Sequence, residues 1–374
     1  MTITKRTTKG SALTYAELDE NFRDLDSDMT LDRVLRNGDS SNSNATILGN
    51  VTLGDVTMKT LTFSGFEGIG ANATHGYTAG GRATTTSWSA AGQRFSFASG
   101  TSESIGNTIS QARENGAAFG SSTHGYAAGG RYGTPTAVAV DDISKYAFSS
   151  SSSETDVGNL SSVRFSIGTG GQQSNTHGYI TGGGTGPTGG NALVNIIEKV
   201  PFTSDGNAID VGDLRVVIQL TSKASSSING YDAGGGIPNV TSSIDKFPFA
   251  TDANSANTAN LSASTAEGGG TSSGLHGYVL GGRTASPGGA DRNDIQKFSF
   301  SIDIAATDVG DLTQARIGVG GHASSTHGFS SGGGTYPPFT TRDVIDKFPF
   351  SVDASATDVG ELTGQRYGAM STQG

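Results

Sequence analysis

Apolar and polar residues alternate in a short segment that recurs along most of this 374-residue chain. A basic residue is followed by an aromatic, any residue and a second aromatic, as in K-F-P-F at residues 246–249 and 347–350. Period-two alternation of this kind predicts a β-strand with one buried face. Proline between the two aromatics of some copies removes a ladder donor, which predicts that this strand lies near the edge of its sheet.

A second motif, H-G-Y followed two residues later by a glycine pair, recurs six times at intervals of 47 to 53 residues. A period of about 50 residues is typical of four-stranded propeller blades rather than of helical repeats. Each unit is predicted to contain a glycine-rich strand opening on a basic residue such as Arg316, the H-G-Y strand, the alternating strand and a D-V-G-x-L strand. The glycine pairs predict positive φ in the turn that follows the second strand. Because H-G-Y occurs in every unit, we interpret it as a packing element of the blade.

The ends of the repeat region predict how the ring closes. Arg366 begins a segment that matches the first strand of a unit, and the chain stops at Gly374. A C-terminal strand over 366–374 is therefore expected to complete the blade that His75 begins, with a strand over 66–74 as the competing candidate. Either choice predicts an all-β fold, a six-bladed β-propeller over residues 62–374, preceded by a short N-terminal helix and a β-rich stalk.

The strand order, the Gly-Gly after the second strand and the aromatic third strand resemble kelch-type propellers across residues 62–374. The tryptophan of the kelch fourth strand is missing, and the single Trp of the chain is Trp88, in a predicted loop. The chain has no cysteine, which excludes disulfides, thiolate metal sites and cysteine nucleophiles. It also excludes the Tyr–Cys copper site of galactose oxidase, the best-known enzyme with this type of propeller.

Charge and hydropathy exclude two further classes of partner. The formal net charge is -10 at pH 7, and no basic cluster occurs in the repeats, so nucleic-acid binding is not expected. No apolar run approaches the roughly 20 residues that span a bilayer, and residues 1–9 lack the apolar core of a signal peptide. We expect a soluble chain without membrane insertion or N-terminal export.

Residues 1–36 carry no repeat and predict one short helix. Thr14 to Glu17 is a capping-box pattern. The apolar positions that follow have heptad spacing and are the predicted virion-attachment or oligomerisation residues: Leu18, Phe22, Leu25 and Met29. Because a single short helix is marginal alone, it is expected to join a small bundle, dock on a partner or pack on the propeller.

Residues 37–61 predict a linker and a short β stalk. The first part is rich in Gly, Ser, Asn and Asp. A five-residue repeat then begins at Leu48, with apolar alternation and Gly-Asn or Gly-Asp turns. One copy of so thin a ribbon cannot bury both faces, whereas chains intertwined around a common axis can. Trimeric fibre shafts bury such ribbons in this way, and the similarity to them implies a homotrimer.

The segment K-G-S-A-L-T-Y-A-E-L-D-E-N-F at residues 9–22 resembles the opening of many tailed-phage fibre and virion structural proteins. The glycine-rich repeats likewise resemble those of virion proteins of marine cyanophages. This resemblance implies a protein of the virion tail, assembled in the host cytoplasm. It also implies an N-terminus attached to tail or baseplate proteins and a C-terminal domain directed at the host.

The loops between the second and third strands are the candidate recognition elements. They vary from 11 to 16 residues, whereas the second strand keeps a fixed length before its glycine pair, and variable loops on a fixed scaffold commonly carry recognition. Aromatic and arginine side chains anchor interfaces and stack on sugar rings. The predicted receptor-binding residues are Arg82, Trp88, Arg131, Tyr132, Arg283, Arg292, Tyr336, Phe339 and Arg342.

No residue pattern indicates a metal site, a cofactor or a catalytic set. The repeated D-V-G-x-L aspartates lack the ligand density of a calcium loop and are interpreted as turn residues bonded to their own backbone. They are Asp156, Asp210, Asp308 and Asp358. The protein is therefore expected not to be an enzyme and to use no cofactor.

Three functions remain open from the sequence. The favoured hypothesis is a phage tail fibre or receptor-binding protein that attaches the virion to a host-surface glycan or protein. The first alternative is a purely structural baseplate or decoration protein without a receptor. The second is a glycan-degrading enzyme, which needs paired carboxylates in a cleft. The candidate loop acids for it are Asp141, Asp142, Asp291, Asp294 and Asp343.

Overall fold

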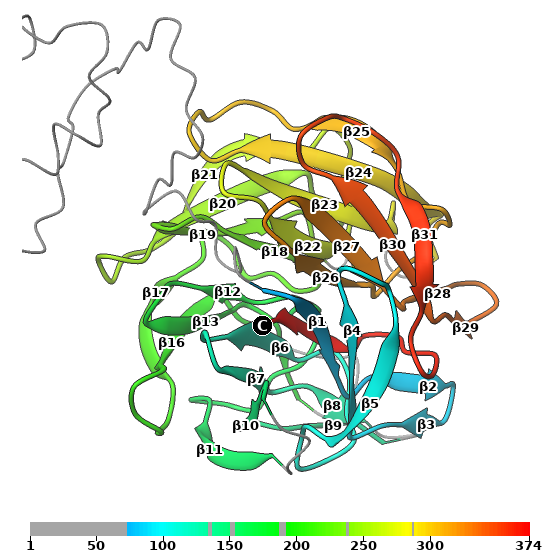
Figure 1. Ribbon diagram of the computed structural model, residues 1–374. Helices are drawn as coiled ribbons and strands as arrows, with labels where there is room; N and C mark the ends of the chain where they lie inside the picture. The colour runs from blue at the N-terminus through cyan, green and yellow to red at the C-terminus, as the bar shows by residue number, and fades with distance from the viewer. Residues whose placement is uncertain (1–72, 134–136, 150–153, 187–191, 237–238, 286–287) are drawn as a thin grey trace, which may run out of the picture. The chain divides into compact units, whose positions relative to one another are not determined.

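The computed structural model describes residues 73–133, 137–149, 154–186, 192–236, 239–285 and 288–374. These residues form six four-stranded antiparallel sheets arranged as blades around a common axis (Figure 1). The all-β, six-bladed β-propeller predicted from the repeat is therefore confirmed. The predicted helix and stalk, regions 1–36 and 37–61 with Leu18, Phe22, Leu25 and Met29, lie outside the described residues.

Each blade runs from an innermost first strand at the axis to an outermost fourth strand, and the first strands of neighbouring blades contact one another. In that order, blade 1 contains β32 (Met370–Gln373), β1 (His75–Ala79), β4 (Ala91–Ser96) and β5 (Ser102–Asn107). Blade 2 contains β6 (Ala117–Gly120), β7 (His124–Ala128), β10 (Asp142–Ala147) and β11 (Thr155–Asn159). Blade 3 contains β12 (Gln172–Gln173), β13 (His177–Thr181), β16 (Ile196–Pro201) and β17 (Ile209–Asp213).

Blades 4 to 6 repeat the same arrangement. Blade 4 contains β18 (Ser222–Ser225), β19 (Asn229–Ala233), β20 (Ser243–Pro248) and β21 (Ala256–Asn260). Blade 5 contains β22 (Gly269–Ser272), β23 (His276–Arg283), β24 (Asp291–Ser299) and β25 (Thr307–Asp311). Blade 6 contains β26 (Gly320–Ala323), β27 (His327–Ser331), β30 (Val344–Pro349) and β31 (Thr357–Glu361). Short hairpins extend four of the loops: β2 (Arg82–Thr84) with β3 (Ser87–Trp88), β8 (Arg131–Tyr132) with β9 (Val138–Ala139), β14 (Gly184–Thr185) with β15 (Ala192–Leu193), and β28 (Gly334–Thr335) with β29 (Thr340–Thr341).

The C-terminal strand closes the ring, as predicted. β32 pairs antiparallel with β1 from Gly76 opposite Gln373 to Ala79 opposite Met370. The strand is shorter than the predicted 366–374, because the ladder with β1 begins only at Met370 and Tyr367 forms an isolated bridge with Arg82 instead. Blade 1 is thus built from both ends of the propeller, so closing it requires the whole repeat region to be in place.

The repeated aromatics join each blade to the next. The aromatic ring of every H-G-Y copy packs on the phenylalanine that directly follows the neighbouring blade's third strand, at centroid distances of 4.5 to 5.4 Å. The six pairs are Tyr77–Phe148, Tyr126–Phe202, Tyr179–Phe249, Tyr231–Phe300, Tyr278–Phe350 and Phe329–Phe97. These contacts support the structural interpretation of the H-G-Y repeat.

The glycine of each H-G-Y copy is explained by a ring that covers it. In blade 6, a Cβ on Gly328 would overlap the ring of Phe348, its cross-strand partner. In blade 3 the cross-strand partner is Val200, and the ring that covers Gly178 comes from Phe119 of the preceding blade. Both positions of the glycine pairs that end these strands have positive φ, for example 62° and 91° at Gly332 and Gly333, as predicted.

The third strand does not lie at an edge, and that prediction was wrong. In every blade it pairs on both sides, with the second and the fourth strands. Proline is tolerated because it is the last residue of the strand: Pro248 pairs with Asn229 of β19, and the ladder with β21 has already ended at Lys246. The prediction of a single buried face was also wrong, because each blade is sandwiched between two others. In β16, Ile197, Glu198 and Val200 are all buried.

The first strand begins later than predicted, which changes the role of the basic residue. Arg316 precedes β26, is fully buried and forms an ion pair with Asp346 of the third strand at 2.6 Å. Arg164 of blade 3 is buried in the same way against Glu198. These arginines therefore fix the loop entering each blade rather than forming part of a strand.

Candidate functional site

The propeller has two chemically different faces. On one, the turn face, lie the turns between first and second strands, which precede each H-G-Y, and the connections between third and fourth strands. On the other, the loop face, lie the connections between second and third strands and those that lead from one blade to the next. Nine candidate residues were predicted on the loops between second and third strands, so all of them belong to the loop face.

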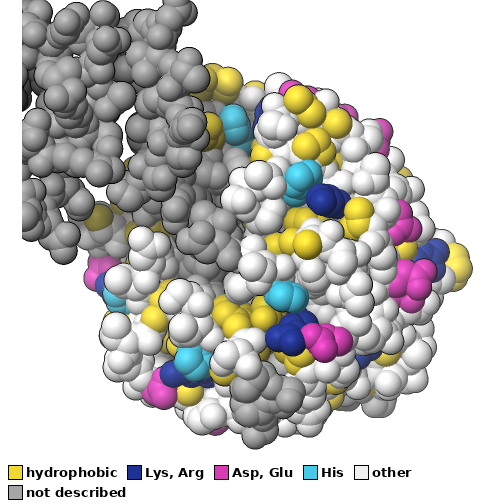
Figure 2. Space-filling view, viewed as in Figure 1, with side chains coloured by type: hydrophobic (Ala, Val, Ile, Leu, Met, Phe, Trp, Pro, Cys, Tyr) yellow, Lys and Arg dark blue, Asp and Glu magenta, His cyan; other side chains and the backbone are white. Residues whose placement is uncertain are grey.

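The turn face carries a repeated ionic contact between blades. The lysine of a third strand reaches an aspartate of the next blade, as in Lys145–Asp205 at 2.9 Å and Lys199–Asp252 at 2.7 Å. Figure 2 shows His side chains spaced around the molecule with basic and acidic side chains beside several of them. Large apolar side chains are also exposed on this face, and they are Ile228, Leu275, Ile302, Ile304 and Val352.

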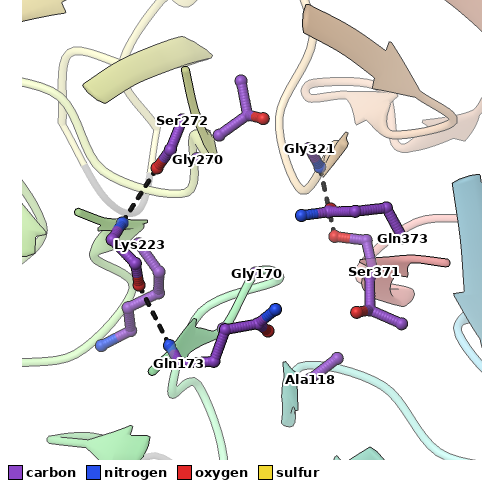
Figure 3. Close-up of a pocket in the computed structure, with 13 residues that line it drawn as sticks. Ala118, Gly170, Gln173, Lys223, Gly270, Ser272, Gly321, Ser371 and Gln373 are labelled. Carbon is purple, nitrogen blue, oxygen red and sulfur yellow. Dashed lines mark hydrogen bonds between the residues drawn. The ribbon is translucent and has the colours of Figure 1, made fainter. Parts of the chain in front are cut away.

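The axis of the propeller does not hold a ligand-sized cavity within the described residues. The pocket there is lined by first-strand residues such as Gln173, Ser225 and Ser371 (Figure 3). Hydrogen bonds join neighbouring first strands, including Ser225 N–H to Ser272 Oγ at 2.9 Å and Gly321 N–H to Ser371 Oγ at 3.1 Å. The room left is about 30 Å³, enough for a water molecule or two and far too little for a sugar.

A ring of left-handed residues surrounds the axis on the loop face. One residue per blade, just before the first strand, has a φ between 55° and 62°: Asn115, Ser166, Leu220, Glu267, Gly318 and Gly368. Backbone hydrogen bonds connect this ring from blade to blade, for example from Glu267 N–H to the Leu220 carbonyl and from Gly318 N–H to the Glu267 carbonyl. Four members are not glycine, so the sequence carries no glycine signal that would have identified the position.

Around this ring, arginines and glutamates form a network that crosses the loop face. The buried carboxylate of Glu114 forms ion pairs with Arg82 at 3.0 Å and with Arg131 at 3.3 Å. Burial raises the pKa of Glu114, and these two guanidinium groups oppose that shift. Across the axis, the Tyr367 hydroxyl donates to Glu267 Oε2 at 3.0 Å. Sequence reasoning did not identify either glutamate or Tyr367, because each differs from the residue at the same repeat position in other blades.

The β28–β29 hairpin of blade 6 spans its two neighbours. At one side of its tip, Tyr336 stacks against Arg283 at 5.4 Å, and its N–H donates to Asp291 of blade 5 at 2.8 Å. At the other side, the ring of Phe339 lies 4.3 Å from the guanidinium of Arg82 in blade 1. Four predicted residues thus meet at one hairpin, although they come from three blades.

Beside Phe339, the loops of blades 6 and 1 enclose an open pocket of about 420 Å³, which we name the seam pocket. Its lining residues are Ala83, Thr84, Thr85, Phe339, Thr340, Thr341, Arg342 and Gln365. The side chain of Thr341 joins its two walls by donating to the Ala83 carbonyl at 2.8 Å. The volume is in the range of small-molecule sites, and the lining combines hydroxyls, an amide, a guanidinium and one aromatic ring.

The remaining predicted residues lie outside the pocket. Trp88 lies in β3, opposite Arg82 of β2 rather than in an irregular loop, and Tyr132 lies in β8. Arg292 pairs with Asp294 at 2.6 Å. The structure therefore brings Phe339 and Arg342 together in one cavity and distributes the others across the network and the neighbouring loops.

Three of the five loop acids considered in the sequence have defined partners for their side chains. Asp142 pairs with the buried Arg113 at 2.6 Å, Asp294 pairs with Arg292, and Asp291 accepts from the N–H of Tyr336. The D-V-G-x-L aspartates accept a hydrogen bond from the backbone N–H two residues later, as Asp156 does from Gly158 at 3.1 Å, which confirms their interpretation as turn residues. Within the described ranges, no group of three or more His, Asp or Glu side chains is arranged to hold a metal ion.

Comparison of the sequence with known protein families finds no family that matches, and comparison with curated proteins finds no significant match. Among the residues that the structure describes, no helix is long and apolar enough to cross a membrane. The fold and the geometry of the loop face define the protein as a six-bladed β-propeller with an open pocket at its closing seam.

Proposed function

We propose that this protein is a tail fibre or receptor-binding protein of a tailed phage, and that its propeller attaches the virion to a glycan or protein on the host surface. The observation that carries the proposal is the loop face, where a pocket of about 420 Å³ lies beside a cluster of arginine and aromatic side chains. The resemblance of residues 9–22 to the opening of phage fibre proteins supports the assignment to a virion.

The path of the chain supports an outward orientation of the loop face. The described chain begins at Ala73, two residues before β1, and the N–H groups of Thr74 and His75 bond to the carbonyl of Gly374. Both ends of the propeller therefore lie at the turn face. The loop face, opposite these two ends, is the face that we propose to be directed toward a host.

The exposed apolar side chains of the turn face fit the same arrangement. Ile228 is 65% exposed and Leu275 is 57% exposed, so both side chains are available for contact with another protein. We assign this face to contacts with other virion tail or baseplate proteins, or with other copies of the chain in a homotrimer. Within a trimer, three propellers would bind one cell surface together, so weak individual sites would suffice.

In finer classification, we propose that the propeller is kelch-like. The glycine pair after each second strand and the aromatic third strand support this, whereas the missing fourth-strand tryptophan is the main departure. We further propose that no cofactor, nucleic acid or catalytic step is involved in attachment.

The test is the binding of fluorescently labelled full-length protein to a panel of candidate host cells, with its molar mass measured by light scattering. Saturable binding to susceptible strains, absent from resistant strains, together with a trimeric mass, is the expected result. Binding only to isolated tail or baseplate proteins, and to none of the cells, would replace the proposal by a structural virion role. Release of reducing sugar from host polysaccharide would establish a glycan-degrading enzyme instead.

A further inference from the structure

The seam pocket contains a guanidinium without an acidic partner. Among the described residues, the guanidinium of Arg342 makes one hydrogen bond, from Nη1 to the carbonyl of Thr341 at 3.3 Å, and forms no ion pair. Three other arginines of the loop face do have acidic partners. Arg82 and Arg131 share Glu114, and Arg292 pairs with Asp294.

A second cation beside the pocket also lacks the acid that its repeat position predicts. Arg366 occupies in blade 1 the place of Arg316 in blade 6, and Arg316 forms an ion pair with Asp346 on its third strand. The position of Asp346 is taken in blade 1 by the neutral Gln93, whose carbonyl accepts hydrogen bonds from Thr363 and Gly364.

Arg366 is left with neutral partners among the described residues. Its guanidinium donates to the carbonyl of Gln365 at 2.8 Å and to Ser89 Oγ at 3.2 Å. Burial lowers the pKa of Arg366, and no carboxylate opposes that shift. Its backbone N–H donates to the carbonyl of Arg342 at 2.9 Å, so the two arginines sit on adjacent segments. Arg366 does not line the seam pocket, so the unpaired charge of the pocket itself is that of Arg342.

We propose that the seam pocket binds an anionic sugar, with its carboxylate or sulfate against Arg342 and its ring on Phe339. This inference rests on the proposed attachment to a host glycan and names the class of sugar that the site takes. Arginine recognises carboxylate and sulfate-like groups through paired N–H donors.

The rest of the lining suits a sugar ring. The guanidinium of Arg82 covers Phe339, while Phe339 itself lines the pocket beside Thr84 and Thr340. An aromatic wall with surrounding hydroxyls matches the alternating apolar and polar surface of a pyranose. A volume of about 420 Å³ accommodates one or two sugar units.

The test measures binding of three probes to the full-length protein by isothermal titration calorimetry: sodium glucuronate, glucose 6-sulfate and glucose. Glucuronate or the sulfate is expected to bind and glucose to bind at least about tenfold more weakly, the usual effect of removing a charge-assisted contact. The ratio of the two anionic affinities identifies the preferred acid group. Equal binding of glucose, or no saturable binding of either anion, would overturn the proposal.

Variants assign the effect to the seam. Arg342→Gln is expected to weaken binding of the anionic sugar about tenfold, whereas Arg342→Lys should retain part of the affinity. Arg215→Gln is the matched control, because it removes a loop-face arginine that already has a carboxylate partner, Asp245 at 3.3 Å. Equal losses from Arg215→Gln and Arg342→Gln would contradict a specific seam site. Unchanged thermal unfolding of each variant separates binding from folding.

Host-cell binding by the same variants separates this inference from the proposed function. Unimpaired attachment of a protein that binds neither anionic sugar would overturn the seam site and leave the adhesin standing. Saturable binding of an anionic sugar without attachment to any susceptible host would support the site and remove the adhesin.

Discussion

Met370 provides a direct test of how the ring is closed. It is the first residue of β32 and is fully buried in a cluster with Tyr77, Ala79 and Ile109 of blade 1 and residues of blade 2. Met370→Ala removes the side chain that the closing strand inserts between its neighbours, while the backbone pairing with β1 is retained. The substitution therefore isolates the packing contribution of the C-terminal strand.

The expected loss follows from the burial and from the rigidity of the site. Replacing a buried Met by Ala costs about 2–5 kcal/mol, with the larger values where the cavity cannot collapse. A Cβ on Gly116 would lie 2.7 Å from Met370 Sδ, and one on Gly80 would lie 3.2 Å from Met370 Cε. Backbone thus forms two walls of the site, and hydrogen-bonded strands do not move to fill a void. We therefore expect a loss in the upper half of the range, about 3–5 kcal/mol.

Urea unfolding of the full-length protein measures this loss, followed by the fluorescence of Trp88 and by far-ultraviolet circular dichroism. Trp88 is the single tryptophan and lies in β3, within the loop that joins β1 to β4 of blade 1, so it reports on the blade that Met370 completes. A fall of about 1 M or more in the urea midpoint is expected. Val352→Ala, at a side chain 60% exposed, is the control and should change stability by less than about 0.5 kcal/mol. Equal shifts for the two variants would refute the reasoning.

Three further predictions concern the repeat and its buried polar groups. Gly328→Ala should destabilise the protein by about 1–3 kcal/mol because the methyl group overlaps a packed ring, whereas Gly206→Ala, with no atom within 4 Å, should have little effect in the same urea assay. Asp346→Asn leaves the buried Arg316 without its charge partner and should lower the free energy of unfolding by about 3–5 kcal/mol. Asp303→Asn, which breaks an exposed ion pair with Lys246, should lower it by at most about 1 kcal/mol. Similar urea midpoints for the two variants would be inconsistent with a buried Arg316–Asp346 pair. Burial lowers the pKa of His322 to about 4 from 6.5. The stability that the folded protein gains from this neutral, buried imidazole is fully present above pH 6.5. It is lost as the pH falls toward 4, because His322 of the unfolded chain takes up a proton first. Urea midpoints from pH 7 to pH 4 should therefore fall less steeply for His322→Gln than for the wild type, and parallel curves would argue against the assignment.

The repeat made the architecture predictable because its signals are local. Glycine pairs need positive φ wherever they end a second strand, and alternating aromatics favour a strand in every copy, so six similar units predict six similar blades. The match of Arg366 to the start of a unit also predicted closure by the C-terminal strand. The stacking of Tyr77 on Phe148 was not predicted, because it joins different blades.

The errors share a physical cause in the contact between blades. Ile197 lies on the face opposite Val200, which the prediction of a single buried face would leave to solvent. Both residues are buried because each blade is sandwiched between two others. Glu198 and Asp346 lie on the aromatic face of their strands, where each meets an arginine of the loop that enters its blade. Likewise, Pro248 would indicate an edge strand only if the third strand paired with the fourth strand along its full length. The pairing with the fourth strand ends at Lys246, before the proline is reached.

The sequence alone therefore determines the number of units, the order of strands within each unit and the variable loops in which recognition residues are sought. Only the tertiary structure decides which loops meet. The Ala83 carbonyl and the Thr341 hydroxyl, 258 residues apart, form one hydrogen bond at the seam pocket because closure of the ring places the first and last loops side by side. The absence of an acid at Gln93 becomes meaningful only there, since charge acts through distance in space and not through position along the chain.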